Sequence, residues 1–216
     1  NAYEVFEALA RGFVRFKDIL SQSQVSSSPT LVDVLDKLIS MDIVVKESPI
    51  NDENNKKKAR YYISDQLNLF YFKYIYRNLS RIAVMDSGFF YDKFIEPDFE
   101  ENHVPKAFEQ VCRQFLIRKN RSGELSDSFE KIGKYWYDDP ENHKNGEFDV
   151  VTENDNSYIF YEAKFREEKL DTNRIWNEIQ QVNNTGLVCN KYGFFSKSGY
   201  KEIDESYRKQ LILYVL

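Results

Sequence analysis

The chain has 216 residues, of which 42% are hydrophobic, so it can bury the core of one large domain or of two small ones. Its net charge of −5 excludes nucleic-acid binding through bulk positive charge, and any DNA contact must come from a local basic patch. No apolar run approaches the roughly 18 residues that cross a bilayer, and no signal peptide is visible, so no membrane partner is expected.

The cysteines Cys112 and Cys189 lie far apart in the sequence and lack the spacing of metal ligands. We expect both to be reduced, mostly buried and small apolar side chains. Reduced thiols are typical of the cytoplasm, which is the location that the sequence favours.

The first residues predict short amphipathic helices. Apolar side chains at helical spacing indicate a helix over residues 3–10, which Gly12 can end, and a second helix over residues 16–20. A third helix is expected to begin with Ser28 as its cap and Pro29 in its first turn. Two strands follow.

These strands are expected over residues 43–45 and 60–63, on either side of the polar stretch 51–59. Three helices followed by a hairpin with a basic tip form the winged-helix pattern, a variant of the helix-turn-helix. The sequence therefore predicts a winged helix-turn-helix module at the N-terminal end.

The third helix carries Asp33 and Asp36 and is poorly suited to phosphate contact, so the hairpin tip is the candidate DNA surface. A solvated hairpin tip, or a module that contacts protein, explains the same residues. The candidate DNA-binding residues are Lys56, Lys57, Lys58 and Arg60.

A long amphipathic helix is predicted over residues 65–85, and an acidic linker over residues 86–105, with Pro97 and Pro105 as helix breakers. The domain boundary is expected in this linker. The predicted organisation is residues 1–64 as the winged-helix module, 65–105 as the bridging helix and linker, and 106–216 as the second domain.

The second domain alternates helices and strands, which predicts an α/β or α+β domain with a mixed sheet. In chain order we expect a helix over residues 107–118, strands over 129–137, 148–152 and 158–165, a helix over 171–182, a strand over 192–195, a short helix around 201–208 and a strand over 211–215.

Three charged residues of this domain suggest chemistry. Glu162 and Lys164 are two apart on one predicted strand and share a face, and Asp149 can approach Glu162 if the two central strands pair as a hairpin. Carboxylates hold Mg²⁺ through hard oxygen ligands, and a lysine can position water or stabilise charge on a phosphate. A plain surface ion pair on a strand is the alternative interpretation.

Asp149 followed by Glu162-Ala163-Lys164 resembles the PD-(D/E)XK motif of nucleases with the restriction-endonuclease fold, with Phe148 in the place of the proline. The resemblance implies that Glu109, on the preceding helix, is a further acid. It also implies that Gln180 on the following helix, or else Gln181, joins the site. The implied catalytic residues are Glu109, Asp149, Glu162, Lys164 and Gln180, and the implied Mg²⁺ ligands are Asp149, Glu162 and Glu109.

A second resemblance covers nearly the whole chain and concerns the C-terminal region of archaeal-type AAA+ ATPases. The segments that carry it are Tyr61-Tyr62-Ile63-Ser64-Asp65, Ala107-Phe108-Glu109 with Cys112-Arg113, Ile132-Gly133 with Trp136, and Glu147-Phe148-Asp149-Val150-Val151. In that family a P-loop ATPase domain precedes a winged helix and a nuclease-like domain of uncertain function.

This chain has no G-x-x-x-x-G-K-[ST] segment and begins with Asn1 rather than methionine. The resemblance therefore implies that an ATPase domain is missing at the N-terminal side, and that ATP binds only through that domain.

Three functions remain open. The first hypothesis is a C-terminal fragment of an AAA+ ATPase that couples nucleotide state to DNA or partner binding through both of its domains. The alternatives are an active Mg²⁺-dependent DNA endonuclease and a DNA-binding module like those of transcription regulators. The expected partners are the ATPase domain of the same protein, double-stranded DNA and another protein.

Overall fold

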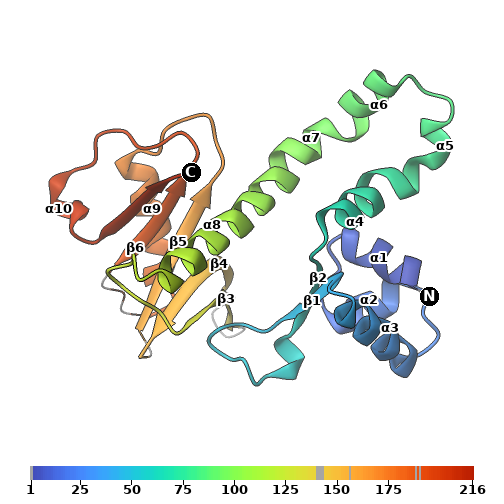
Figure 1. Cartoon of the computed structure of the whole chain (residues 1–216), viewed down its shortest axis with the longest axis horizontal. Helices are drawn as coiled ribbons and strands as arrows, with labels where there is room; N and C mark the ends of the chain where they lie inside the picture. The colour runs from blue at the N-terminus through green and yellow to red at the C-terminus, as the bar shows by residue number, and fades with distance from the viewer. Residues whose placement is uncertain (1, 140–143, 156, 188, 190) are drawn as a thin grey trace. The chain divides into compact units, whose positions relative to one another are not determined.

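The computed structural model describes the chain except for residues 1, 140–143, 156, 188 and 190 (Figure 1). The chain divides into two compact units of mixed α and β structure. Unit 1 comprises Asn1–Ser48 and Asp52–Asp98, and unit 2 comprises Pro49–Asn51 and Phe99–Leu216. Among the described residues, no helix is both long enough and apolar enough to cross a membrane.

Unit 1 begins with three helices and a two-stranded antiparallel sheet, in the order that the sequence predicts. The elements are α1 (Ala2–Ala10), α2 (Phe16–Gln22), α3 (Ser28–Ser40), β1 (Val44–Glu47) and β2 (Arg60–Ile63). Each of the three helices and β1 contributes fully buried side chains to a shared core, for example Val5, Ile19, Leu31 and Val44. The helical spacing of apolar residues thus creates the buried faces that hold these elements together.

The ends of the helices follow local capping chemistry. Gly12 ends α1 with a φ of +88°, a conformation that costs glycine little. The cap of α3 is Ser27 rather than the predicted Ser28, because the Ser27 hydroxyl accepts a hydrogen bond from the Thr30 backbone N–H at 3.4 Å. Pro29 lies in the first turn, as predicted.

The segment that follows β2 is helical but irregular. The predicted single helix is divided into α4 (Gln66–Phe70), a π-helical turn (Tyr71–Ile75), a 3-10 turn (Tyr76–Asn78) and α5 (Leu79–Ile82). Phe72 from this segment stacks on Phe6 of α1, with ring centroids 4.6 Å apart. The aromatic side chains therefore attach the segment to the core of unit 1.

The stretch that the sequence predicts as an acidic linker is helical instead. It forms α6 (Ser87–Phe94), α7 (Glu96–Asp98) and a π-helical turn (Phe99–His103). Asp86 caps α6 by accepting a hydrogen bond from the Phe89 N–H at 3.1 Å, and Pro105 occupies the first turn of the next helix. The two units divide after Asp98, so the helical segment after β2 belongs to unit 1 and is not a separate bridge.

Unit 2 is built on a five-stranded mixed sheet with the order β3-β4-β5-β6-β7. The strands are β3 (Lys131–Asp139), β4 (Lys144–Asn154), β5 (Ser157–Lys164), β6 (Tyr192–Ser196) and β7 (Leu211–Val215). The first three strands pair antiparallel, and β5, β6 and β7 pair parallel. The helices are α8 (Val104–Arg121), α9 (Thr172–Asn183) and α10 (Glu205–Arg208).

Helices α8 and α9 cover opposite faces of this sheet (Figure 1). Tyr161 of β5 packs with Phe108 and Cys112 of α8, whereas the neighbouring Phe160 packs with Ile179 of α9. This is the alternation expected of successive residues on a strand. The sheet therefore has two apolar faces, each covered by a helix.

A short segment from the β1–β2 connection belongs to unit 2. The Ile50 N–H donates a hydrogen bond to the Lys134 carbonyl at 2.7 Å, and the Asn51 side-chain amide donates to the Trp136 carbonyl at 3.4 Å. Ile50 is buried and packs with the aromatic core on the α9 side of the sheet. These contacts pair the segment with the outer edge of β3.

Gly193 of β6 leaves the room that the Tyr161 ring occupies, since a Cβ at this position would lie 1.9 Å from Tyr161 Cδ1. Replacing Gly193 with alanine is expected to destabilise the chain by about 1–3 kcal/mol, because the buried ring must move. Urea unfolding of Gly193→Ala measures the loss. In a Gly193→Ala/Tyr161→Val double variant the ring is absent, so the alanine should destabilise the chain less than it does in the presence of Tyr161. Purely additive losses of unfolding free energy would contradict this explanation.

Candidate functional site

The predicted site residues of the sheet come together through the β4–β5 hairpin. The antiparallel register of the hairpin ends at the pair Val150–Tyr161, and Asp149 and Glu162 lie one residue beyond it, close enough for their carboxylates to interact electrostatically. Lys164 follows two residues later on β5 and leaves the same face of the strand as Glu162. The hairpin that the sequence predicts therefore brings Asp149 beside the Glu162-Ala163-Lys164 segment.

A bulge in β4 adds a lysine that the sequence did not reveal. Gly133 pairs with Val151 and Tyr135 pairs with Phe148, so Asp149 and Val150 together oppose the single residue Lys134. The Lys134 ammonium lies 2.5 Å from Asp149 Oδ1 and 3.2 Å from Glu147 Oε1. Bulges redirect side chains, and this one directs Asp149 toward a cation on the neighbouring strand.

Helix α8 supplies Glu109, whose carboxyl group hydrogen-bonds with that of Asp149. Burial raises the pKa of Glu109 to about 8, and the nearby Asp149 and Glu162 carboxylates act in the same direction, whereas Lys134 opposes them. At neutral pH the Glu109 carboxyl group therefore keeps its proton and can donate a hydrogen bond to Asp149.

A second group of ions lies on the α9 side of the hairpin. The Lys164 ammonium lies 2.6 Å from Glu162 Oε1 and 2.8 Å from Glu178 Oε1 of α9. Burial raises the pKa of the Glu162 carboxyl group, an effect that Lys164 opposes and Glu178 reinforces. Burial also works against the Lys164 ammonium, yet the two carboxylates hold the pKa of this lysine above its ordinary value. We call Glu109, Lys134, Asp149, Glu162, Lys164 and Glu178 the acid–lysine cluster.

Glu178 occupies the place that the sequence assigned to Gln180. Two residues along a helix correspond to about 200° of rotation, so these side chains leave α9 on different sides. The hydrogen bonds and ion pairs of the cluster, within the described residues, do not include Gln180 or Gln181. Glu178 lies three residues after the buried Ile175 and directly before the buried Ile179, and this position at the edge of the apolar face was the signal that could have identified it.

The cluster offers oxygen ligands of the kind that Mg²⁺ prefers. No three His, Cys, Asp or Glu side chains among the described residues lie close enough to enclose a metal ion. Mg²⁺ usually binds through one or two carboxylates and keeps several waters, so the adjoining Glu109 and Asp149 match its needs as a pair. The proton that Glu109 holds would have to leave when an ion binds.

The predicted DNA contacts lie in unit 1. Lys56, Lys57 and Lys58 form a 3-10 turn, and Arg60 begins β2. Lys56 and Lys57 are exposed, whereas the Lys58 ammonium lies 2.8 Å from Asp52 Oδ2. Asp52 therefore offsets part of the positive charge at this tip.

Comparison with known proteins identifies relatives, and none of them has an assigned activity. Residues 71–175 match the DUF234 family. This family is described as archaeal and bacterial proteins of unknown function. The DUF234 match includes Glu109, Lys134, Asp149, Glu162 and Lys164 and ends before Glu178.

The uncharacterized protein MJECL04 of Methanocaldococcus jannaschii is 32% identical to the chain over 179 residues. This similarity covers 82% of the chain but only 38% of MJECL04. A crystal structure of AF1548, a protein of unknown function, is similar at 19% identity and a TM-score of 0.32, over 46% of this chain and 55% of that one.

The raised pKa of Glu109 predicts a pH-dependent stability. The folded chain keeps this proton up to about pH 8, whereas the unfolded chain releases it near pH 4.5. The stability that the proton supplies is complete below about pH 4.5 and is lost as pH rises through 8. Between pH 5 and 8.5 the wild type should lose about 1–3 kcal/mol of its free energy of unfolding, measured by urea unfolding, and Glu109→Gln should not show this loss. Glu101→Gln, at an exposed position of unit 2, is the control, and parallel pH profiles for wild type and Glu109→Gln would contradict the assignment.

Proposed function

We propose that unit 2 carries a PD-(D/E)XK-type site that binds Mg²⁺ and hydrolyses phosphodiester bonds of DNA. The observation that carries this proposal is the convergence of the acid–lysine cluster. The Glu109 carboxyl group of α8 hydrogen-bonds with Asp149, and the Asp149 carboxylate interacts electrostatically with Glu162, which pairs with Lys164. The residue types and their order in the chain are those of the nuclease motif.

Each side chain has a role that its surroundings support. Asp149 and Glu109 provide oxygen ligands, and Glu162 adds negative charge that the ion would offset. Bound Mg²⁺ supplies Lewis acidity, which polarises the phosphodiester and lowers the pKa of a coordinated water. Lys164 remains a cation, because Glu162 and Glu178 hold its pKa high, so it can orient the scissile phosphate through charge.

In the metal-free site, Lys134 is expected to supply the positive charge that Mg²⁺ would supply when bound. The Lys134 ammonium lies 2.5 Å from Asp149 Oδ1. It therefore neutralises the negative charge that a bound Mg²⁺ ion would otherwise neutralise. Binding of Mg²⁺ would release Lys134 from Asp149 and leave it with Glu147, which is already 3.2 Å away. The lysine would keep the apo site stable and lower its affinity for metal.

A second candidate function is a non-catalytic coupling module in an AAA+ ATPase. Two observations favour it: the chain covers 38% of MJECL04, and Lys134 and Lys164 already pair with Asp149 and Glu162. In this candidate, a preceding ATPase domain binds ATP, and unit 1 acts as a winged helix. Both units would then transmit nucleotide state to DNA or to a partner protein.

Metal binding and DNA cleavage test the first candidate directly. Wild-type protein is expected to bind Mg²⁺ or Mn²⁺ in calorimetry and to nick supercoiled plasmid. Asp149→Asn should weaken metal binding about tenfold or more, because a carboxylate ligand is lost. Lys164→Ala should slow nicking by roughly 10²-fold, because charge stabilisation at the phosphate is lost.

Lys169→Ala, at an exposed position of unit 2, is the matched control and should nick plasmid at the wild-type rate. Circular dichroism establishes that each variant is folded. Nicking that survives in both Asp149→Asn and Lys164→Ala would exclude the site. Metal binding without nicking by the wild type would exclude hydrolysis and favour the coupling module.

The hairpin tip provides a separate test of the winged-helix assignment. Lys57→Glu should weaken binding of a DNA duplex and reduce the slope of log affinity against log salt by about one to two, because phosphate contact is lost. Fluorescence anisotropy at several salt concentrations measures both values. Lys37→Glu on α3 has the same charge change away from the tip. Equal effects of the two variants would show that the tip makes no specific contribution.

A further inference from the structure

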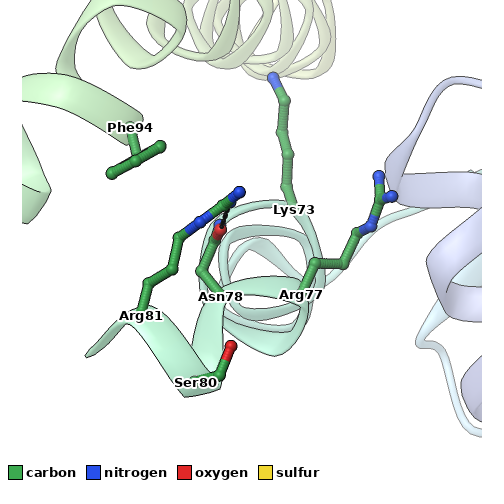
Figure 2. Close-up of a pocket in the computed structure, with 6 residues that line it drawn as sticks. All are labelled: Lys73, Arg77, Asn78, Ser80, Arg81 and Phe94. Atoms are coloured by element: carbon green, nitrogen blue, oxygen red, sulfur yellow. Dashed lines mark hydrogen bonds between the residues drawn. The ribbon is translucent and has the colours of Figure 1, made fainter. Parts of the chain in front are cut away.

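Unit 1 contains a polar hollow that belongs to neither the acid–lysine cluster nor the hairpin tip. Its volume is about 450 Å³. It lies between the irregular helical segment after β2 and the end of α6 (Figure 2). The lining residues are Lys73, Arg77, Asn78, Ser80, Arg81 and Phe94, which include three cations and no carboxylate.

The three cations recur every four residues along this irregular helical segment. Lys73, Arg77 and Arg81 all line the hollow. Like charges gathered around one hollow repel one another. An anion bound in the hollow would offset part of that repulsion.

Two of the three cations have acidic partners within unit 1. Lys73 pairs with Asp98, which also accepts a hydrogen bond from the Tyr74 hydroxyl at 2.6 Å. The Arg77 Nε lies 3.1 Å from Glu7 Oε1, and Figure 2 shows its guanidinium turned away from Arg81. The charge that remains for a ligand is therefore centred on Arg81.

Arg81 is held in place by neutral groups. Its guanidinium donates a hydrogen bond to Asn78 Oδ1 at 2.6 Å and lies 4.9 Å from the centre of the Phe94 ring (Figure 2). A cation–π contact and a neutral amide position the guanidinium without cancelling its charge. The remaining N–H groups of such a planar fork suit the oxygens of a phosphate.

We propose that this hollow binds a phosphate group, carried either by a nucleotide or by a strand of nucleic acid. Arg81 supplies the principal contact, Ser80 supplies a hydroxyl donor, and Lys73 and Arg77 add positive charge at longer range. The hollow is large enough for a nucleotide-sized ligand. This binding is independent of the proposed hydrolysis in unit 2, because no residue is shared between the two sites.

The test compares two fluorescent probes, an ATP analogue and a short labelled DNA duplex, by anisotropy with the full chain. Arg81→Gln removes the charge but can still donate a hydrogen bond to Asn78, so the fold is expected to persist, as circular dichroism can verify. Affinity for at least one probe should fall about tenfold, as expected for loss of a charged hydrogen bond. Arg81→Lys should retain more of the affinity than Arg81→Gln.

Lys37→Gln on α3 removes one positive charge from another exposed position of unit 1 and is the matched control. If Arg81→Gln loses affinity for the duplex alone, the ligand is a nucleic-acid strand. If it loses affinity for the ATP analogue alone, the ligand is a nucleotide. Absence of binding by the wild type, or equal binding by Arg81→Gln and Lys37→Gln, overturns the proposal. Neither result depends on whether unit 2 binds metal or cleaves DNA.

Discussion

Mutual repulsion among carboxylates at one place on the sheet is the constraint on which unit 2 depends. Glu109, Asp149, Glu162 and Glu178 come from four elements and would destabilise the fold if all were ionised without cations. Two lysines and one retained proton offset this charge. Removing either lysine would leave half-buried carboxylates without compensation, so the cluster is costly to maintain. A cluster that costs stability and is nevertheless built from several elements is typical of a functional site rather than of a structural one.

The fold was predictable where the sequence is locally consistent. The strands of unit 2 and helices α8 and α9 were expected within a few residues of their observed ends, because their apolar periodicity and flanking polar residues agree. The stretch after β2 was harder, since its aromatic residues suit a helix of any kind and do not reveal the π-helical and 3-10 turns. Pro97 and Pro105 were taken as breakers, but a proline in the first turn starts a helix as readily as it ends one.

The site was predictable as far as the motif reaches. Asp149, Glu162 and Lys164 follow from hairpin pairing and strand alternation, and the resemblance to the nuclease motif supplied Glu109. Lys134 was missed because its approach to Asp149 depends on a bulge, and one unpaired residue in a ladder leaves no clear mark in a sequence. Glu178 was missed because the motif directed attention to glutamine, although Glu178 sits at the border of the buried face of α9.

The three residues Pro49–Asn51 give the chain an unusual connectivity, because it enters unit 2, returns to unit 1 and crosses again after Asp98. Expression of residues 99–216 alone would therefore omit a native part of that unit. The Lys134 carbonyl would lose the hydrogen bond that the Ile50 N–H donates, and the apolar surface that the Ile50 side chain covers would be exposed to solvent. A truncated protein that precipitates would reflect this missing edge rather than an inherent inability of the domain to fold by itself. Supplying the tripeptide through a circularly permuted or fused design would restore the severed pairing.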